Sequence, residues 1–206
     1  MVNRLLTTTN IPKMFRTTMY TDYDSTRGRP DILNRLQAWK PSDSNPSALF
    51  AGPPGLGKTM LACAAINETH SRCRFKTVSC RSIPDDALLV VRQQRAPVYF
   101  IQLSEFIALH IRLIRLQARV DRGTIDPMEY EEIEALLEDL KDRVKLLVVD
   151  DVGKEHRTGS GFAEDEFDLL VRTRHNRGLA TIYTSNIPLE QWSDQYSESL
   201  QNLIQR

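Results

Sequence analysis

Residues 52–59 read Gly-Pro-Pro-Gly-Leu-Gly-Lys-Thr, the most specific motif in the chain. It matches the pattern GxxxxGK[ST] in full, in which a glycine-rich loop at the start of a helix wraps phosphate groups with backbone N–H groups. The apolar residues 48–51 predict a strand before the loop, and the residues from Lys58 to His70 predict a helix after it. A chance Gly/Pro turn would not need this context, whereas phosphate binding does. The residues expected to bind phosphates are Gly52, Pro53, Pro54, Gly55, Leu56, Gly57, Lys58, Thr59 and Met60.

Two side chains of this loop have expected roles in chemistry. In such a motif the lysine reaches the β- and γ-phosphates, and the hydroxyl residue completes the coordination shell of a Mg²⁺ ion. Lys58 and Thr59 hold these positions, so ATP and Mg²⁺ are the expected cofactors. No Asn-Lys-x-Asp motif for reading guanine follows the loop, which disfavours a GTPase.

A second strand carries two carboxylates at its end. Residues 145–151 read Lys-Leu-Leu-Val-Val-Asp-Asp, which predicts a buried strand from 146 to 150. Ligands of open α/β sheets bind at the carboxyl edge, so these acids are expected beside the phosphates. We expect Asp150 to hold Mg²⁺ and Asp151 to orient and activate the attacking water. The alternative is a buried strand that ends in two solvated aspartates.

Residues 181–186, Thr-Ile-Tyr-Thr-Ser-Asn, form a third strand that ends in small polar side chains. In an ATPase sheet, the amide of Asn186 would point at the water or the γ-phosphate, although a plain Ser-Asn turn explains the pattern equally well. A further strand is predicted at 98–102, and helices at 30–40 and 128–143, the latter capped by Asp126. Alternating strands and helices predict a parallel sheet with both faces covered. Residues 75–80 and 87–91 could each be a strand or an insertion.

Together, GPPGLGKT, LLVVDDVGKE and TIYTSN resemble the AAA+ ATPases, and within them the bacterial helicase-loader and IstB-like (DnaC/IstB-like) branch. The resemblance implies an α/β fold, a three-layer αβα P-loop NTPase sandwich with a mostly parallel five-stranded sheet. It implies an ATPase in which Lys58, Asp151 and Asn186 are catalytic, and Thr59 and Asp150 bind the metal.

The function implied is a helicase loader of DNA replication that assembles on single-stranded DNA. The alternatives are a transposition helper ATPase and a nucleotide-gated adaptor with little hydrolysis. The implied partners are a replicative helicase or a transposase, together with further copies of the chain when ATP is bound.

The sequence departs from the family pattern in three places. An Asp-Asp pair stands where AAA+ proteins usually carry Asp-Glu. Ser199 and Leu203 stand where a helix of the family often carries arginines, which leaves Arg206 or Arg174 as the trans-acting group. Because the chain stops at 206, we expect the lid to be minimal or absent, with residues 1–45 as an arm and lead-in helix and 46–206 as the ATPase core. Glu155 is a further candidate carboxylate.

Composition and charge indicate where the protein works and what it contacts. The 206 residues carry 27 basic and 27 acidic side chains, which disfavours a general polyanion-coating protein. No apolar run is long enough for a membrane helix and no secretory signal is visible, so a cytoplasmic location is expected. Residues 72–122 hold ten basic and four acidic residues, whereas residues 123–151 hold three and ten.

A stripe of arginines lies in the basic segment. Arg112, Arg115, Arg119 and Arg122 are spaced by three, four and three residues, which places them along one side of a helix. Such a stripe could follow the backbone of single-stranded DNA. It could instead meet the acidic residues 129–142 of a neighbouring molecule, or form a solvated helix face.

Overall fold

The computed structural model describes residues 9–24, 30–39, 47–72, 98–153, 161–194 and 196–205. The segments 75–80 and 87–91, as well as Glu155 and Arg206, lie outside these residues, so their predictions stay open.

Four parallel strands form the sheet, in the spatial order β1 (Ser47–Ala51), β4 (Ala180–Ser185), β3 (Leu146–Val152) and β2 (Val98–Gln102). All four strand predictions are confirmed within two residues at each end. The prediction of five strands is wrong for the described part of the chain, which has four. The number five came from the family resemblance, whereas only four described segments carry the apolar run that a buried parallel strand needs.

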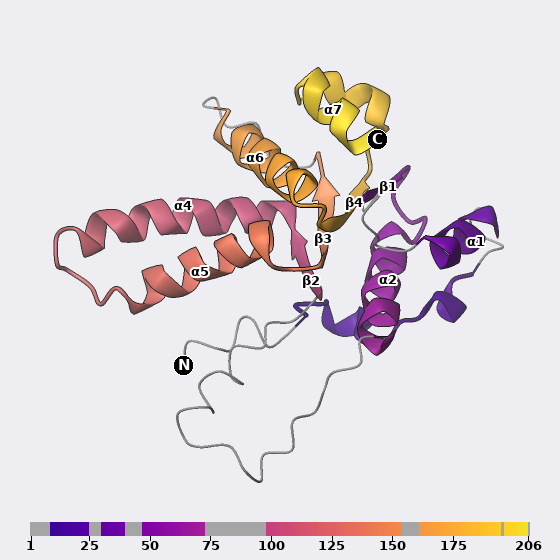
Figure 1. Ribbon diagram of the computed structural model, residues 1–206, viewed down its shortest axis with the longest axis horizontal. Helices are drawn as coiled ribbons and strands as arrows, with labels where there is room; N and C mark the ends of the chain where they lie inside the picture. The colour runs from indigo at the N-terminus through magenta and orange to yellow at the C-terminus, as the bar shows by residue number, and fades with distance from the viewer. Residues whose placement is uncertain are drawn as a thin grey trace, which may run out of the picture.

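Alternating side chains of the strands face two separate cores. Val98 and Phe100 of β2 pack on the side of α2, whereas Tyr99 and Ile101 pack on the opposite side. The helix α2 (Lys58–Arg72) and the short α1 (Pro30–Ala38) cover the first face. The second face is covered by α4, α5, α6 and α7, whose bounds are Leu103–Val120, Met128–Asp142, Phe162–Asn176 and Glu198–Gln205. Figure 1 shows the resulting three layers, with α2 on one side of the sheet and α4, α5 and α6 on the other.

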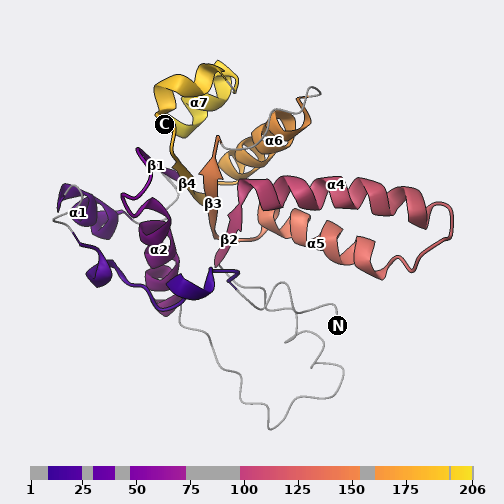
Figure 2. The same ribbon diagram turned by 180° about the vertical axis from the view of Figure 1, so that it is seen from behind.

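The helices α4 and α5 form a long hairpin that extends away from the sheet, as Figure 2 shows from behind. The helix predicted at 128–143 is confirmed as α5, and the Asp126 carboxylate accepts a 2.9 Å hydrogen bond from the N–H group of Met128, as expected of a cap. The apolar side chains predicted to share one face of α5 are all buried; these are Ile133, Leu136, Leu137 and Leu140.

Residues 9–24, called here the lead-in segment, run from the outer edge of the sheet to the phosphate loop. At the β2 edge, the N–H group of Phe100 donates to the carbonyl of Thr9, and the amide of Asn10 donates to the carbonyl of Phe100, both at 2.9 Å. On α2, the amide of Asn67 donates to two lead-in carbonyls, those of Phe15 at 3.0 Å and Thr18 at 2.8 Å. The two bonds to Phe100 cover backbone groups at the edge of the sheet, and those of Asn67 fasten the segment to α2.

Among the described helices, none is both long enough and apolar enough to cross a membrane.

Candidate active site

The phosphate loop joins β1 to α2, and its glycines adopt backbone angles that other residues avoid. The φ angles of Gly52, Gly55 and Gly57 are +148°, +84° and +78°. A Cβ atom at Gly57 would lie 3.4 Å from the ring of Tyr23, which is an ordinary van der Waals contact. The loop therefore needs glycine for its backbone turn.

Hydrogen bonds to the loop and to the end of β4 hold Lys58 at the start of α2. Its ammonium group donates to the carbonyls of Gly52 and Pro53, both at 2.8 Å, and to the Oδ1 atom of Asn186 at 2.7 Å. The lysine thus joins the loop to the end of β4, so two residues that the sequence analysis assigned separately lie in contact.

The predicted metal ligands also lie side by side. The hydroxyl of Thr59 donates a 2.9 Å hydrogen bond to the Oδ1 atom of Asp150. Asp150 ends the apolar run of β3 and only 2% of its surface is exposed. A buried carboxylate needs partners, and the Thr184 hydroxyl supplies another by donating to the same Oδ1 atom at 2.6 Å.

A one-residue bulge separates the two carboxylates. Val149 of β3 pairs with Tyr183 of β4 and Val152 pairs with Ser185, so two residues, Asp150 and Asp151, oppose Thr184 alone. Asp151 has a φ of +61°, one of two positive values outside glycine in the described residues. In a regular strand, consecutive side chains point to opposite faces, whereas a bulge redirects one of them.

The redirected carboxylate meets the third predicted residue. The amide nitrogen of Asn186 donates to the Oδ1 atom of Asp151 at 3.4 Å, while its oxygen accepts from Lys58. Two strand ends and one helix start therefore converge: Lys58 and Thr59 begin α2, Asp150 and Asp151 lie on β3, and Asn186 follows β4.

The residues at this site fit a nucleotide with its magnesium ion. No cluster of three or more His, Cys, Asp and Glu side chains in the described residues could hold a metal by itself. Magnesium, however, is usually held by one or two protein oxygens together with the phosphates of the substrate. The neighbouring oxygens of Thr59 and Asp150, beside a loop of backbone N–H groups, are the donor set that this arrangement requires.

Thr184 is a residue of this site that the sequence analysis did not single out. Its hydroxyl also accepts a 3.0 Å hydrogen bond from the backbone N–H group of Asp151. The signal that could have identified Thr184 is the run of polar residues 184–186 at the end of an apolar strand. From this run, the sequence analysis gave a role to Asn186 alone.

Arg174, one of the two candidates for a trans-acting arginine, is buried completely. Its guanidinium donates to the hydroxyl of Thr181 and to three backbone carbonyls of the same chain, those of Leu140, Val144 and Ala180. These contacts exclude a role at a neighbouring molecule.

Ser199 stands where an arginine of the family was expected. Its hydroxyl accepts a 3.0 Å hydrogen bond from Arg172, which also pairs with Asp168.

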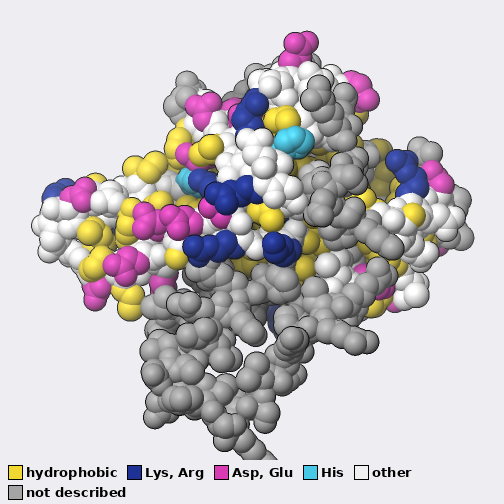
Figure 3. Space-filling model, in the orientation of Figure 1, with side chains coloured by type: hydrophobic (Ala, Val, Ile, Leu, Met, Phe, Trp, Pro, Cys, Tyr) yellow, Lys and Arg dark blue, Asp and Glu magenta, His cyan; other side chains and the backbone are white. Residues whose placement is uncertain are grey.

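The predicted arginine stripe lies on and just beyond α4, away from the phosphate loop. Arg112, Arg115 and Arg119 are exposed, and Arg112 pairs with Glu129 of α5. Arg122 donates to the carbonyl of Ala118. The acidic helix thus contacts one of these arginines within the chain. Figure 3 shows acidic side chains among hydrophobic ones on the part of the hairpin that faces the viewer.

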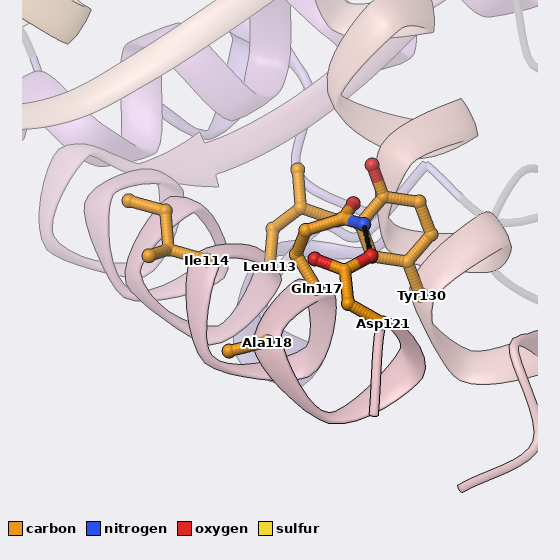
Figure 4. Close-up of a pocket in the computed structure, with 6 residues that line it drawn as sticks. All are labelled: Leu113, Ile114, Gln117, Ala118, Asp121 and Tyr130. Carbon is orange, nitrogen blue, oxygen red and sulfur yellow. Dashed lines mark hydrogen bonds between the residues drawn. The ribbon is translucent and has the colours of Figure 1, made fainter. Parts of the chain in front are cut away.

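The hairpin also bears a shallow hollow of about 330 Å³, which Figure 4 shows in close-up. Among its lining residues, the Gln117 amide donates a 2.6 Å hydrogen bond to Asp121. Because α4, α5 and the residue that follows α4 line this hollow, it is separate from the site at the strand ends. The lining residues are Leu113, Ile114, Gln117, Ala118, Asp121 and Tyr130.

The parallel sheet, the glycine loop before α2 and the acids at the end of β3 define a P-loop nucleoside triphosphatase fold. Residues 48–186 match the family described as "ATPase family associated with various cellular activities (AAA)", and the chain belongs to this AAA family. No curated protein matches the chain at a significant level.

Solved structures of replication proteins share the fold at low identity. The DnaC helicase loader is 18% identical with a TM-score of 0.58, over 94% of this chain and 93% of that one. DnaI is 17% identical with a TM-score of 0.57, over 95% and 90%. The replication initiator DnaA bound to AMPPCP and single-stranded DNA is 18% identical with a TM-score of 0.60, over 95% of this chain and 49% of that one.

Proposed function

We propose that this AAA protein binds ATP with Mg²⁺ and hydrolyses it. The observation that carries the proposal is the convergence of Lys58, Asp151 and Asn186, in which the Asn186 amide contacts both the lysine and the carboxylate.

The proposed roles follow from the position of each group. The loop N–H groups and Lys58 bind the phosphates, where positive charge stabilises the negative charge that develops in the transition state. Thr59 and Asp150 would hold the magnesium ion, which would supply positive charge beside the phosphate oxygens. Asp151 accepts a proton from the attacking water, and Asn186 orients that water.

We further propose that the ATPase acts in DNA replication as a helicase loader. The fold matches the DnaC and DnaI structures over nearly their full length, which supports this role over unrelated ATPase functions. The proposed partners are a replicative helicase and further copies of this chain. A transposition helper ATPase uses the same motifs and is the alternative within the same class.

Single-stranded DNA is the proposed nucleic-acid ligand, contacted by the side of α4 that carries Arg115 and Arg119. Both guanidiniums are exposed, as phosphate contacts require. Arg112 belongs to the same stripe but already pairs with Glu129, so we place it at the border of the contact.

The second candidate is a nucleotide-gated adaptor that binds ATP and hydrolyses it slowly. Two observations favour it: Ser199 and Leu203 occupy the positions where arginines were expected, and Arg174 is buried in its own subunit.

A steady-state ATPase assay with and without single-stranded DNA tests the proposal. Turnover that single-stranded DNA stimulates supports the DNA-coupled ATPase. Tight ATP binding with negligible turnover under both conditions identifies the adaptor. If the protein binds no ATP, both candidates are wrong.

A further inference from the structure

We propose that Thr184 is a positioning residue for hydrolysis, which fixes the bulge in β3 and thereby directs Asp150 and Asp151 to different tasks. This inference rests on the proposed function. It concerns how a side chain on β4 sets the geometry of its neighbours, and it assigns Thr184 no contact with ATP.

The hydroxyl of Thr184 is used in both directions at the bulge. It donates to Oδ1 of Asp150 at 2.6 Å and accepts from the N–H group of Asp151 at 3.0 Å. An extra residue in a bulge loses its place in the ladder of backbone hydrogen bonds. The hydroxyl of Thr184 replaces that ladder partner for the N–H group of Asp151.

The two bonds have separate consequences for the site. The bond to Asp150 places its carboxylate against the Thr59 hydroxyl, which shares the same oxygen as acceptor. The bond to the Asp151 backbone holds that residue at its φ of +61°, and this backbone angle brings its carboxylate to Asn186. One side chain therefore sets the separation between the proposed metal ligand and the proposed base.

Thr184 is suited to this task because it cannot move easily. It is 1% exposed, and a β-branched side chain has few rotamers available. Its neighbour on β4, Ser185, makes a comparable bond to the carbonyl of Val152 at 2.8 Å, after normal pairing resumes.

Two substitutions separate the hydroxyl from the shape of the side chain. Thr184→Val removes the hydroxyl and keeps the branched form, whereas Thr184→Ser keeps the hydroxyl. We expect kcat of the valine variant to fall by about 100-fold, the effect of a misplacement on the order of 1 Å. At saturating Mg²⁺ the KM for ATP should change little, because the loop and Lys58 are untouched. Serine should restore most of the turnover. A purely structural role predicts that thermal stability falls in parallel with activity and that the split between kcat and KM is absent.

Two further measurements keep this inference distinct from the proposed function. The first is the Mg²⁺ concentration needed for half-maximal ATP binding, which the valine variant should raise whether or not ATP is hydrolysed. The second is hydrogen exchange at the Asp151 amide of the protein alone, which should be faster in Thr184→Val and unchanged in Thr184→Ser. Wild-type exchange at Asp151 in the valine variant overturns the proposal, as does full turnover by that variant. If the wild type does not hydrolyse ATP, the proposed ATPase function is wrong. Faster hydrogen exchange at Asp151 in the valine variant would still support the role of Thr184 at the bulge.

Discussion

The ammonium group of Lys58 donates a 2.7 Å hydrogen bond to the Oδ1 atom of Asn186, although 128 residues separate the two in sequence. The contact joins the phosphate loop to the end of β4. Because both residues also belong to motifs recognised in the sequence, their contact is a sensitive point at which to test the site.

Replacing Lys58 should remove nucleotide binding and leave the fold intact. Lys58→Ala deletes the positive charge proposed to meet the β- and γ-phosphates, and its hydrogen bonds are made at an accessible loop. We expect ATP affinity, measured by titration calorimetry, to fall by at least about tenfold, which corresponds to about 1.4 kcal/mol. Lys145→Ala, at an exposed lysine before β3, is the matched control. ATP affinity equal to that of wild type would show that the phosphates bind elsewhere.

Replacing Asp151 should separate binding from hydrolysis. Asparagine tolerates the left-handed backbone of Asp151 as well as aspartate does, so Asp151→Asn should preserve the bulge. ATP and Mg²⁺ should still bind, whereas turnover should fall by about 100-fold or more because an amide cannot accept the proton of the water. Phosphate release in single-turnover experiments measures this loss. Asp165→Asn on the surface of α6 is the control, and unchanged turnover in Asp151→Asn would assign the base to another residue.

Reversing the charge of Arg115 and Arg119 tests the DNA contact. If both guanidiniums bind phosphates, the double change to Glu should weaken binding of single-stranded DNA. It should also flatten the dependence of the affinity on salt by about 1.4 units on the log–log scale, at about 0.7 for each lost contact. ATP binding should not change, because the stripe lies away from the phosphate loop. Fluorescence anisotropy at several salt concentrations gives the slope.

The same variant distinguishes the other interpretations of the stripe. Sedimentation shows whether the charge reversal breaks an assembly with the acidic α5 of a neighbour. The double change Lys13→Glu and Arg16→Glu, at exposed residues of the lead-in, matches the change in total charge. Unchanged assembly together with wild-type DNA affinity would leave a solvated helix face.

Replacing Arg174 should destabilise the protein. Its guanidinium is the donor for three buried carbonyls and one hydroxyl, and burial lowers its pKa to about 10. In Arg174→Met these acceptors lose a charged partner, so we expect a loss of about 3–5 kcal/mol in the free energy of unfolding by urea. Arg177→Met, on the surface nearby, should cost less than about 1 kcal/mol. A variant that keeps its stability and loses only ATPase activity would contradict the structural role.

Stability should depend on the protonation of His110. Burial, with a smaller contribution from the Lys141 ammonium, lowers the pKa of His110 from 6.5 to about 4, although Glu166 lies 3.1 Å from its Nδ1 atom. The folded protein therefore holds a neutral imidazole over a range in which the unfolded chain binds a proton. Its contribution to stability is complete above about pH 6.5 and is lost as the pH falls toward 4, by up to about 3 kcal/mol.

A second histidine, His175 on α6, provides the control for this pH dependence. His110→Gln should flatten the difference in unfolding free energy between pH 6.5 and 4, whereas His175→Gln, at an exposed position, should leave it unchanged. An identical pH profile for the wild type and His110→Gln would show that the Glu166 carboxylate offsets the effect of burial.

Local sequence patterns were sufficient to predict the strands and the phosphate loop. The glycines of the loop and the apolar runs of β2, β3 and β4 act over a few neighbouring residues, so they can be recognised in the chain itself. Lys58 and Asn186 belong to different motifs of the sequence. They lie together because parallel strands bring their carboxyl ends to one edge of the sheet. The fifth strand, in contrast, was inferred from the family resemblance alone, and the described residues form four strands.

The directions in which particular side chains face depend on contacts between distant segments. The bulge at Asp150 and Asp151 depends on the register between β3 and β4, and a hydroxyl on β4 binds both residues. Arg174 looks like any arginine near the end of a helix, yet its environment is made by α5, β4 and the turn before β3. The sequence determines which groups are available at the site, because residue type and local spacing set its chemistry. Their orientation and burial depend on contacts between segments distant in the chain, which no local pattern encodes.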